Sequence, residues 1–303
     1  MSQIPEEVRA LAAERAERRA AKDFAAADAL REAIAVLGFG VVDGPDGQSL
    51  EPLMTSGDAG PLRAADVESV LAEPATADVT VQWVVEGWPD DVRRAIAAFR
   101  AAATGREVQY VVADLTGADE DYGEHVEVLR LEPGIGWASA RNAGLRRSRG
   151  RIVLAMDGSI EPTGEVLGPL ETALADAAVG VCGPYGISTR DLREFTEDPG
   201  PEVDAIEGYC MAFRRELLAE VGVFDEKFRW YRTADIEFSF RVKDAGYRCL
   251  VVDVPVTKHE HRMWHATPAE ERERLSKRNF YRFLERFRGR TDLLVGPGDA
   301  PRE

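Results

Sequence analysis

Short apolar runs alternate with amphipathic segments from about residue 78 to the C-terminus. The runs at 79–85, 108–113, 126–131, 152–156, 179–183 and 249–254 predict strands. The segments at 90–103, 139–147, 165–177 and 268–288 predict helices. Apolar runs of strand length are typical of parallel strands that are covered on both faces. The alternation therefore predicts an α/β fold with a mixed, mainly parallel sheet and flanking helices.

The first fifty residues follow a different pattern, that of a small helical hairpin. Val8 and Leu11 recur at helical spacing, and a second series includes Phe24, Ala27 and Ile34. A short strand is expected at 39–42, and the DGPDG run that follows it predicts a turn. We predict three regions: a hairpin module at 1–53, a linker at 54–77 and a main domain at 78–303.

The sequence allows two roles for each of two segments in the main domain. Residues 183–207 form a polar, acidic stretch with Gly and Pro, which predicts a long functional loop or lid. The helix expected at 268–288 is amphipathic and rich in arginine. Its apolar stripe could lie on a membrane surface or pack on the sheet, and we favour packing on the sheet.

Composition narrows the function classes. The formal net charge is −16, which argues against a general binder of nucleic acid or of anionic membranes. Three cysteines without metal-ligand spacing, Cys182, Cys210 and Cys249, are expected to be buried, reduced thiols. No apolar run approaches the ~20 residues that a membrane span needs, and the N-terminus does not read as a signal peptide. We expect a cytoplasmic protein.

Three aspartates stand where an α/β sheet concentrates chemistry. Asp114 and Asp157 each follow a predicted strand, and ligands bind beyond the carboxyl ends of such strands. Asp235 stands at the start of a predicted helix. Each has a structural alternative, since aspartate also closes turns and caps helices.

Two histidines, His259 and His261, follow the strand at 249–254. We expect only one of the two to face the site. A histidine of this kind, taken alone, is more often structural or exposed than a ligand.

Four blocks in a fixed order carry a resemblance across residues 79–288. They are 136–145 (GWASARNAGL), 150–157 (GRIVLAMD), 213–226 (FRRELLAEVGVFDE), preceded by Gly208, and 235–248 (DIEFSFRVKDAGYR). Together they resemble family 2 glycosyltransferases of the GT-A fold. The resemblance implies an inverting transfer of a sugar from a UDP-, GDP- or dTDP-linked donor to an acceptor hydroxyl. The acceptor would be a sugar, a lipid-linked molecule or a small molecule.

The resemblance also implies roles for single residues. Asp114, Arg141 and Gly208 would contact the nucleotide sugar. Asp157 would contact the nucleotide and bind Mg²⁺ or Mn²⁺, joined by His261, with His259 as the alternative. Hard cations of this kind prefer oxygen ligands, including those of a diphosphate.

The catalytic base would be Asp235, which takes the proton of the acceptor hydroxyl. Three features depart from the family pattern. Ser159 replaces the second acid of the DxD motif, and Ala234 replaces the Glu that precedes the base. The first strand ends at 83–88 (WVVEGW) instead of in the usual Pro-Thr-Tyr-Asn-like turn. The departures leave a second hypothesis open, a non-catalytic scaffold or binding protein on a degenerate GT-A domain.

Residues 20–38 (AAKDFAAADALREAIAVLG) and 41–47 (VVDGPDG) resemble the C-terminal tail of cysteinyl-tRNA synthetases. In that family the tail belongs to the anticodon-recognition region. Here nine acidic residues outnumber six basic ones up to residue 50, which disfavours a phosphate-binding surface. We favour a module for homodimerisation or partner recruitment over one that binds RNA.

Overall fold

A computed structural model describes residues 4–21, 23–36, 39–44, 47–52, 60–102 and 105–296. It divides into two units, Met1–Gly60 and Pro61–Glu303, which we treat separately. Part of the predicted turn near residue 45 and of the predicted linker (53–59) lies outside the described residues. The second part of that linker lies in the larger unit, where Ala64 in η1 (Ala64–Asp66) and Val67 are buried.

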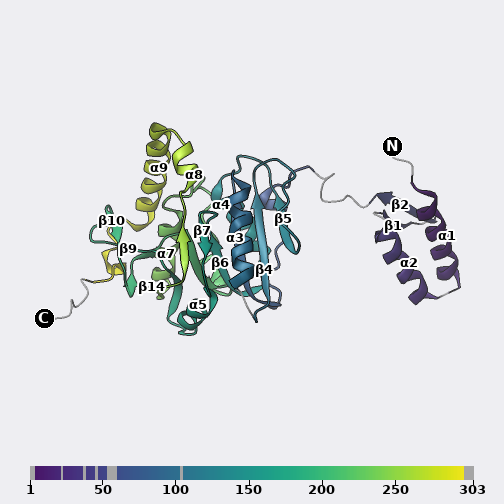
Figure 1. The fold of residues 1–303 in the computed structure, drawn as a ribbon, viewed down its shortest axis with the longest axis horizontal. Helices are drawn as coiled ribbons and strands as arrows, with labels where there is room; N and C mark the ends of the chain where they lie inside the picture. Colours follow the sequence, from purple (N-terminus) through teal and green to yellow (C-terminus); the bar gives the residue numbers. More distant parts are fainter. Residues whose placement is uncertain are drawn as a thin grey trace. The chain divides into compact units, whose positions relative to one another are not determined.

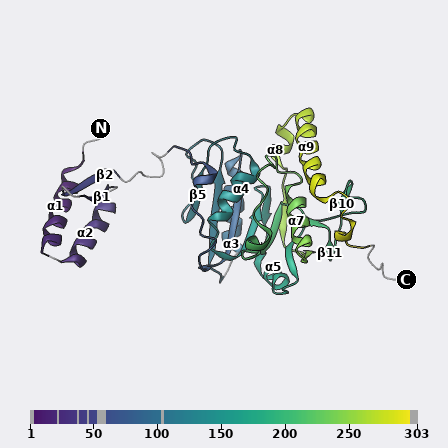
Figure 2. The ribbon, with the colours of Figure 1, turned by 180° about the vertical axis from the view of Figure 1, so that it is seen from behind.

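The smaller unit is a helical hairpin followed by a strand pair (Figures 1 and 2). Its elements are α1 (Glu6–Ala20), α2 (Phe24–Val36), β1 (Phe39–Gly44) and β2 (Gly47–Pro52). Val8, Ala12, Ile34 and Val41 form its core, which confirms the predicted helical periodicity. Phe24 departs from the prediction, because 60% of it is exposed.

The larger unit is built on an eight-stranded mixed sheet, as predicted. Its strands, in spatial order, are β11 (Glu202–Val203), β14 (Arg248–Val251), β8 (Val179–Gly183), β13 (Cys210–Arg214), β6 (Gly150–Met156), β3 (Ala77–Val85), β4 (Val108–Asp114) and β5 (Val126–Arg130). The contiguous strands β6, β3, β4 and β5 are parallel, whereas β13 runs antiparallel between β6 and β8. The sequence analysis did not predict β13.

Helices cover both faces of this sheet. Figure 1 shows α3 in front of the sheet, and Figure 2, seen from behind, shows α4 in front of it. The helices α3 (Pro89–Ala102) and α5 (Leu167–Leu174) pack on one face. The helices α4 (Trp137–Arg146) and α7 (Ala234–Asp244) pack on the other, with α6 (Leu217–Val221) beside them. Alternation along β6 serves both layers: Leu154 faces α3 and Val153 faces α7.

The segment predicted as a loop at 183–207 contains a small three-stranded sheet. It consists of β9 (Gly186–Thr189), β10 (Phe195–Glu197) and β12 (Ala205–Ile206), all antiparallel. Strands of two to four residues are too short to show a period in the sequence. This sheet lies beside the carboxyl end of β8 and contributes one wall of the site described below.

The C-terminal segment packs against the domain. A strand pair joins β7 (Ile160–Pro162) to β15 (Val256–Lys258), and α8 (Arg262–Ala266), α9 (Ala269–Phe287) and η2 (Thr291–Leu293) follow. Phe283 and Phe287 of α9 are buried against Phe240 of α7, so the apolar stripe is covered by protein. No helix in the described ranges is long and apolar enough to cross a membrane.

Candidate active site

The carboxyl ends of the parallel strands meet at one edge of the sheet. Trp83 of β3 pairs with Met156 of β6, so Glu86 and Asp157 leave neighbouring strands at similar heights. On the other side, β3 pairs through Val85 with Asp114, the last residue of β4. This arrangement is the one predicted from the sequence, and it is the position where open α/β sheets bind ligands.

Asp157 is held in its charged form by a tight turn. Its Oδ1 accepts hydrogen bonds from the Ser159 amide at 2.8 Å and the Ser159 hydroxyl at 2.5 Å. Its Oδ2 lies 3.3 Å from Nε2 of His261. Burial alone raises the pKa of Asp157, but His261 and Ser159 outweigh it and lower the pKa below its ordinary value. Ser159, which replaces an acid, therefore supports Asp157 instead of adding a second carboxylate.

The two histidines face different partners. His261 lies beside Asp157, and its Nδ1 accepts a hydrogen bond from the Trp264 amide at 3.2 Å. His259 instead contacts Glu161, with 2.6 Å between Nε2 and Oε2. The structure therefore brings His261 to the site and directs His259 to a neighbouring ion-pair cluster.

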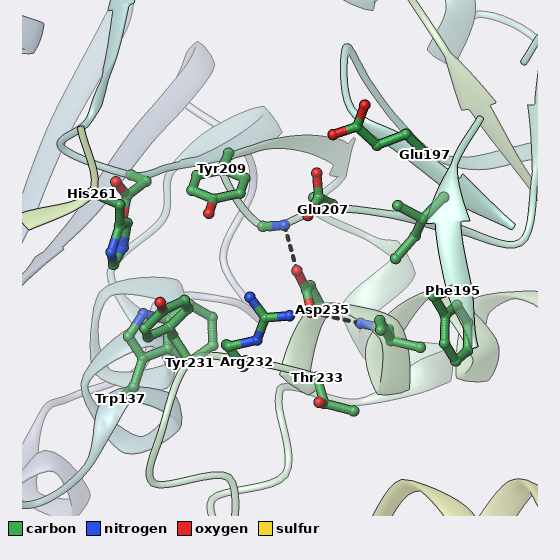
Figure 3. A pocket seen from close by; sticks show the side chains of 14 residues that line it. Trp137, Phe195, Glu197, Glu207, Tyr209, Tyr231, Arg232, Thr233, Asp235 and His261 are labelled. Atoms are coloured by element: carbon green, nitrogen blue, oxygen red, sulfur yellow. Dashed lines mark hydrogen bonds and ion pairs between the residues drawn. The ribbon is translucent and has the colours of Figure 1, made fainter. Parts of the chain in front are cut away.

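Asp235 lies across the pocket from His261, at the start of α7 (Figure 3). Its Oδ2 accepts from the Gly208 amide at 2.8 Å, and its Oδ1 accepts from the Ile236 amide at 2.9 Å. Burial raises the pKa of Asp235, and these amide hydrogen bonds offset only part of that effect. A Cβ at position 208 would lie 3.3 Å from the Asp235 Cβ, so a larger residue there would press on the Asp235 side chain.

Both aspartates line one cavity. Tyr209, Tyr231 and Trp137 form an aromatic wall between them (Figure 3). The far end is lined by Ile187 and Phe195 of the small sheet. The cavity can thus hold a substrate with polar groups at both carboxylates and an apolar face between them.

Two carboxylates of the site were not singled out from the sequence. Glu207 lines the cavity beside Asp235, and burial together with the Asp235 charge raises its pKa to about 7. Glu86 lies on the other side of Asp157, and burial raises its pKa to about 7 as well. Glu86 follows the end of β3, in a turn that departs from the family pattern. That departure was the sequence feature that could have drawn attention to Glu86.

Asp114 and Arg141 are buried, and neither lines the cavity that contains Asp157 and Asp235. Asp114 accepts from the Thr116 amide at 2.8 Å and from the Tyr122 hydroxyl at 3.0 Å. Arg141 donates to the carbonyls of Gln82 at 2.8 Å and Met156 at 3.2 Å, just before Glu86 and Asp157. Its guanidinium thus ties the ends of β3 and β6 together. Burial lowers the pKa of Arg141 to about 10, which leaves it charged near neutral pH.

The Asp157 carboxylate fits a divalent cation, whereas His261 could ligate through Nε2 only with its proton on Nδ1, where the ring now accepts from the Trp264 amide. Two neighbouring ligands of an ion at 2.0–2.2 Å lie about 3 Å apart, close to the 3.3 Å between Oδ2 and Nε2. Within the described ranges no group of three or more His, Cys, Asp or Glu side chains could hold an ion. An ion here would therefore take its remaining ligands from the diphosphate and from water.

A mixed sheet with helices on both faces and a cleft at its carboxyl edge is the architecture of the GT-A fold. Residues 104–238 match the family Glycosyl transferase family 2, so the larger unit carries a glycosyltransferase domain. Residues 1–49 match the family Cysteinyl-tRNA ligase anticodon binding domain. The comparisons thus confirm both resemblances seen in the sequence.

Curated relatives follow the same division. An N-acetylglucosaminyl-diphospho-decaprenol L-rhamnosyltransferase of Mycobacterium tuberculosis (strain ATCC 25618 / H37Rv) is 27% identical over 66% of this chain and 68% of its own length. The cysteine–tRNA ligase of Opitutus terrae is 53% identical over 51 residues, which are 17% of this chain and 11% of the ligase.

Solved structures support the fold. GalNAc-T7 with UDP, GalNAc and Mn²⁺ aligns with a TM-score of 0.55 and 17% identity, covering 69% of this chain and 48% of that protein. A mannosyltransferase of Pyrobaculum calidifontis in complex with GDP-Man and Mn²⁺ aligns with a TM-score of 0.52 and 19% identity. The alignment covers 75% of this chain and 71% of the mannosyltransferase.

Proposed function

We propose that the chain transfers a sugar from a nucleotide-diphosphate sugar to an acceptor hydroxyl with inversion at the anomeric carbon. The observation that carries this proposal is the pair of aspartates that share one cavity with opposite pKa shifts. A charged carboxylate suits a cation and a nucleotide, whereas a carboxylate with a raised pKa suits proton transfer.

The donor diphosphate would lie at Asp157 and His261. Asp157 would hold Mg²⁺ or Mn²⁺, and His261 would join it only after the ring proton moves from Nε2 to Nδ1 and the Trp264 contact is released. The ion, when bound, neutralises charge on the leaving diphosphate. Because Arg141 fixes the ends of β3 and β6 from below, we assign it a positioning role instead of the direct contact that the resemblance implied. Asp114 orders the segment after β4 through Thr116 and Tyr122, and a contact of Asp114 with the nucleobase remains a proposal.

The acceptor would enter from the end lined by Ile187 and Phe195. Asp235 takes the proton of its hydroxyl as that oxygen attacks the anomeric carbon. The bond from that carbon to the diphosphate breaks on the opposite face, and the nucleotide leaves. Water is a competing acceptor. A saccharide on a polyprenyl diphosphate, as in the rhamnosyltransferase relative's name, is one acceptor class to test.

Calorimetric titration of the full chain with UDP, GDP and dTDP tests the proposal, with and without Mn²⁺. We expect at least one nucleotide to bind, more tightly with the ion. If none binds under either condition, the donor site that we assign does not exist and the scaffold hypothesis gains.

The N-terminal unit suggests a second function of the chain, because its sequence is similar to part of the cysteine–tRNA ligases. We propose that it recruits a partner, with RNA as the tested alternative. The full chain and a chain lacking residues 1–60 would be compared in a gel-shift assay with tRNA. A shift by the full chain alone would favour RNA over a protein partner.

A further inference from the structure

Arg232 carries an unpaired guanidinium on the wall of the cavity. The residue lies in the loop before α7, and Figure 3 shows its side chain among the cavity residues, beside Asp235. Among the described residues, its guanidinium has no hydrogen bond and no carboxylate within ion-pair distance. A guanidinium presents five N–H donors in a planar fork, so this group has its donors available for a ligand.

Trp264 holds this guanidinium in place without neutralising it. The Cζ atom of Arg232 lies 4.9 Å from the centre of the Trp264 ring. Asn279 of α9 adds a hydrogen bond from its side chain to the Arg232 carbonyl at 2.8 Å. Stacking on an aromatic ring orients a guanidinium and leaves its positive charge available. Arg232 is therefore preorganised to bind an anion.

A second cation lies on the same indole. The Cζ atom of Arg272 is 4.4 Å from the centre of the Trp264 ring, and its Nη1 donates to the Trp264 carbonyl at 3.1 Å. Arg272 has no carboxylate partner in the part of the chain that the structure describes. By contrast, Arg282 of the same helix is paired with Asp225 at 2.6 Å. Two guanidiniums without acidic partners thus create a local positive potential in a chain of net charge −16.

The charge of Arg232 acts at the acceptor end of the cavity. It opposes the rise in pKa of Asp235 and of Glu207. The pKa of Asp157, where we place the donor diphosphate, is instead set by its burial and by contacts with His261 and Ser159. An anion bound by Arg232 would therefore belong to the acceptor.

The acidic side chains of this end leave one side open to an anion. Glu197 and Glu207 come from β10 and from the turn before β13, and Figure 3 shows both on the other side of Asp235 from Arg232. An anion on the Arg232 side would be separated from them by Asp235 and by the acceptor itself. This position is next to the proposed base.

We propose that Arg232 binds a phosphate group of the acceptor, so that the attacking hydroxyl belongs to a phosphorylated saccharide. This inference rests on the proposed function, because it uses the end of the cavity where we assign the acceptor. A phosphate held at Arg232 would anchor the saccharide beside Asp235, which takes the hydroxyl proton. Arg272 strengthens the positive potential that attracts the phosphate.

Matched ligands test the inference by binding alone. The full chain with Mg²⁺ would first be saturated with a nucleotide diphosphate that it binds, which fills the donor site. Glucose 1-phosphate, glucose, N-acetylglucosamine 1-phosphate and N-acetylglucosamine would then be titrated calorimetrically. We expect at least one phosphate to bind about 10-fold or more tightly than its free sugar, the effect of a charge-assisted hydrogen bond. The ratio should fall to nearly one in Arg232→Gln and be intermediate in Arg232→Lys, because Lys lacks the planar fork.

Arg274→Gln is the matched control, because it removes a cation of α9 that is 62% exposed and paired with Glu271. It should keep the wild-type ratio. Wild-type protein that binds neither phosphate, or that binds phosphates and free sugars alike, overturns the inference and leaves the proposed function intact.

The variants add two further outcomes. A preference for the phosphates that is preserved in Arg232→Gln overturns the inference. A loss of nucleotide affinity of about 10-fold or more in Arg232→Gln would place Arg232 at the donor diphosphate and would also overturn it. The wild-type ratio decides even if the variants fold poorly, and failure of every nucleotide to bind overturns both proposals.

Discussion

Asp157 and Asp235 are two aspartates in one cavity, and the protein treats them in opposite ways. Asp157 has a pKa below its ordinary value, because a hydroxyl, an amide and an imidazole outweigh its burial. Asp235 has a pKa above its ordinary value, because the hydrogen bonds from its two amide donors do not outweigh its burial. The difference in partners, not in burial, assigns them separate tasks.

The comparison extends to the two ends of the cavity. The Asp157 end is built on β6 and closed by His261 and Ser159, which fix a permanent negative charge. The Asp235 end adds Glu207, whose pKa is also raised, to about 7. A second carboxylate beside Asp235, the proposed base, thus comes from the turn before β13, although Ala234 replaces the Glu expected from the resemblance. We infer a donor end with fixed charge and an acceptor end whose carboxylates exchange protons.

Asp235→Asn should have the largest effect. Asn cannot accept the hydroxyl proton, so kcat should fall by about 10²–10⁴-fold, the usual contribution of a general base. The nucleotide Kd should change by less than about threefold, because the donor lies at the other end. Steady-state kinetics and calorimetry check the two expectations, and equal turnover by the variant would remove Asp235 from the base role.

Asp157→Asn should show the reverse pattern. It removes the fixed charge and the oxygen next to His261, so affinity for UDP or GDP with Mn²⁺ should fall by about 10- to 100-fold. Calorimetry on both variants measures this directly, with Asp235→Asn as the control. Similar losses of affinity in the two variants would abolish the distinction between the ends.

The carboxyl-end position of Asp157 was predictable, since a buried strand followed by an acid and a turn is a local pattern. The place of Asp235 was also predictable, but only through the resemblance. The neighbours Glu207 and Glu86 were not, because their proximity depends on β13 running antiparallel beside β6 and on the turn after β3. Such contacts between distant segments leave no period in the sequence. Arg141 illustrates the same limit: the resemblance implied a contact with the nucleotide sugar, whereas the buried guanidinium donates to two backbone carbonyls.

The pH dependence of transfer should report the raised pKa of Asp235. A general base works when deprotonated, so kcat/KM should fall as the pH falls through a pKa above the ordinary 3.8. Arg232 opposes this rise, so Arg232→Gln should move the acidic limb to higher pH. Rate profiles between pH 4 and 9 measure the acidic limb of the wild type and that of Arg232→Gln. An acidic limb that moves to lower pH in Arg232→Gln would contradict the electrostatic account.

Glu207→Gln should have the smallest effect, and it acts on stability. Burial raises the pKa of Glu207 from 4.5 to about 7, so the folded protein retains a proton that the unfolded chain releases. Below about pH 4.5 both states are protonated and no stability is lost, whereas stability falls as the pH rises through 7. Gln carries no charge, so the variant should gain about 1–2 kcal/mol in unfolding free energy over wild type between pH 5 and 8, less than the full shift allows.

Urea denaturation at the two pH values measures the change in unfolding free energy. Glu216→Gln is the control, because that side chain is 82% exposed and lies away from the cavity. Its difference from wild type should be the same at both pH values. If Glu207→Gln is destabilised more at pH 8 than at pH 5, Glu207 is a fixed charge like Asp157. The acceptor end would then not be the proton-exchanging half of the site.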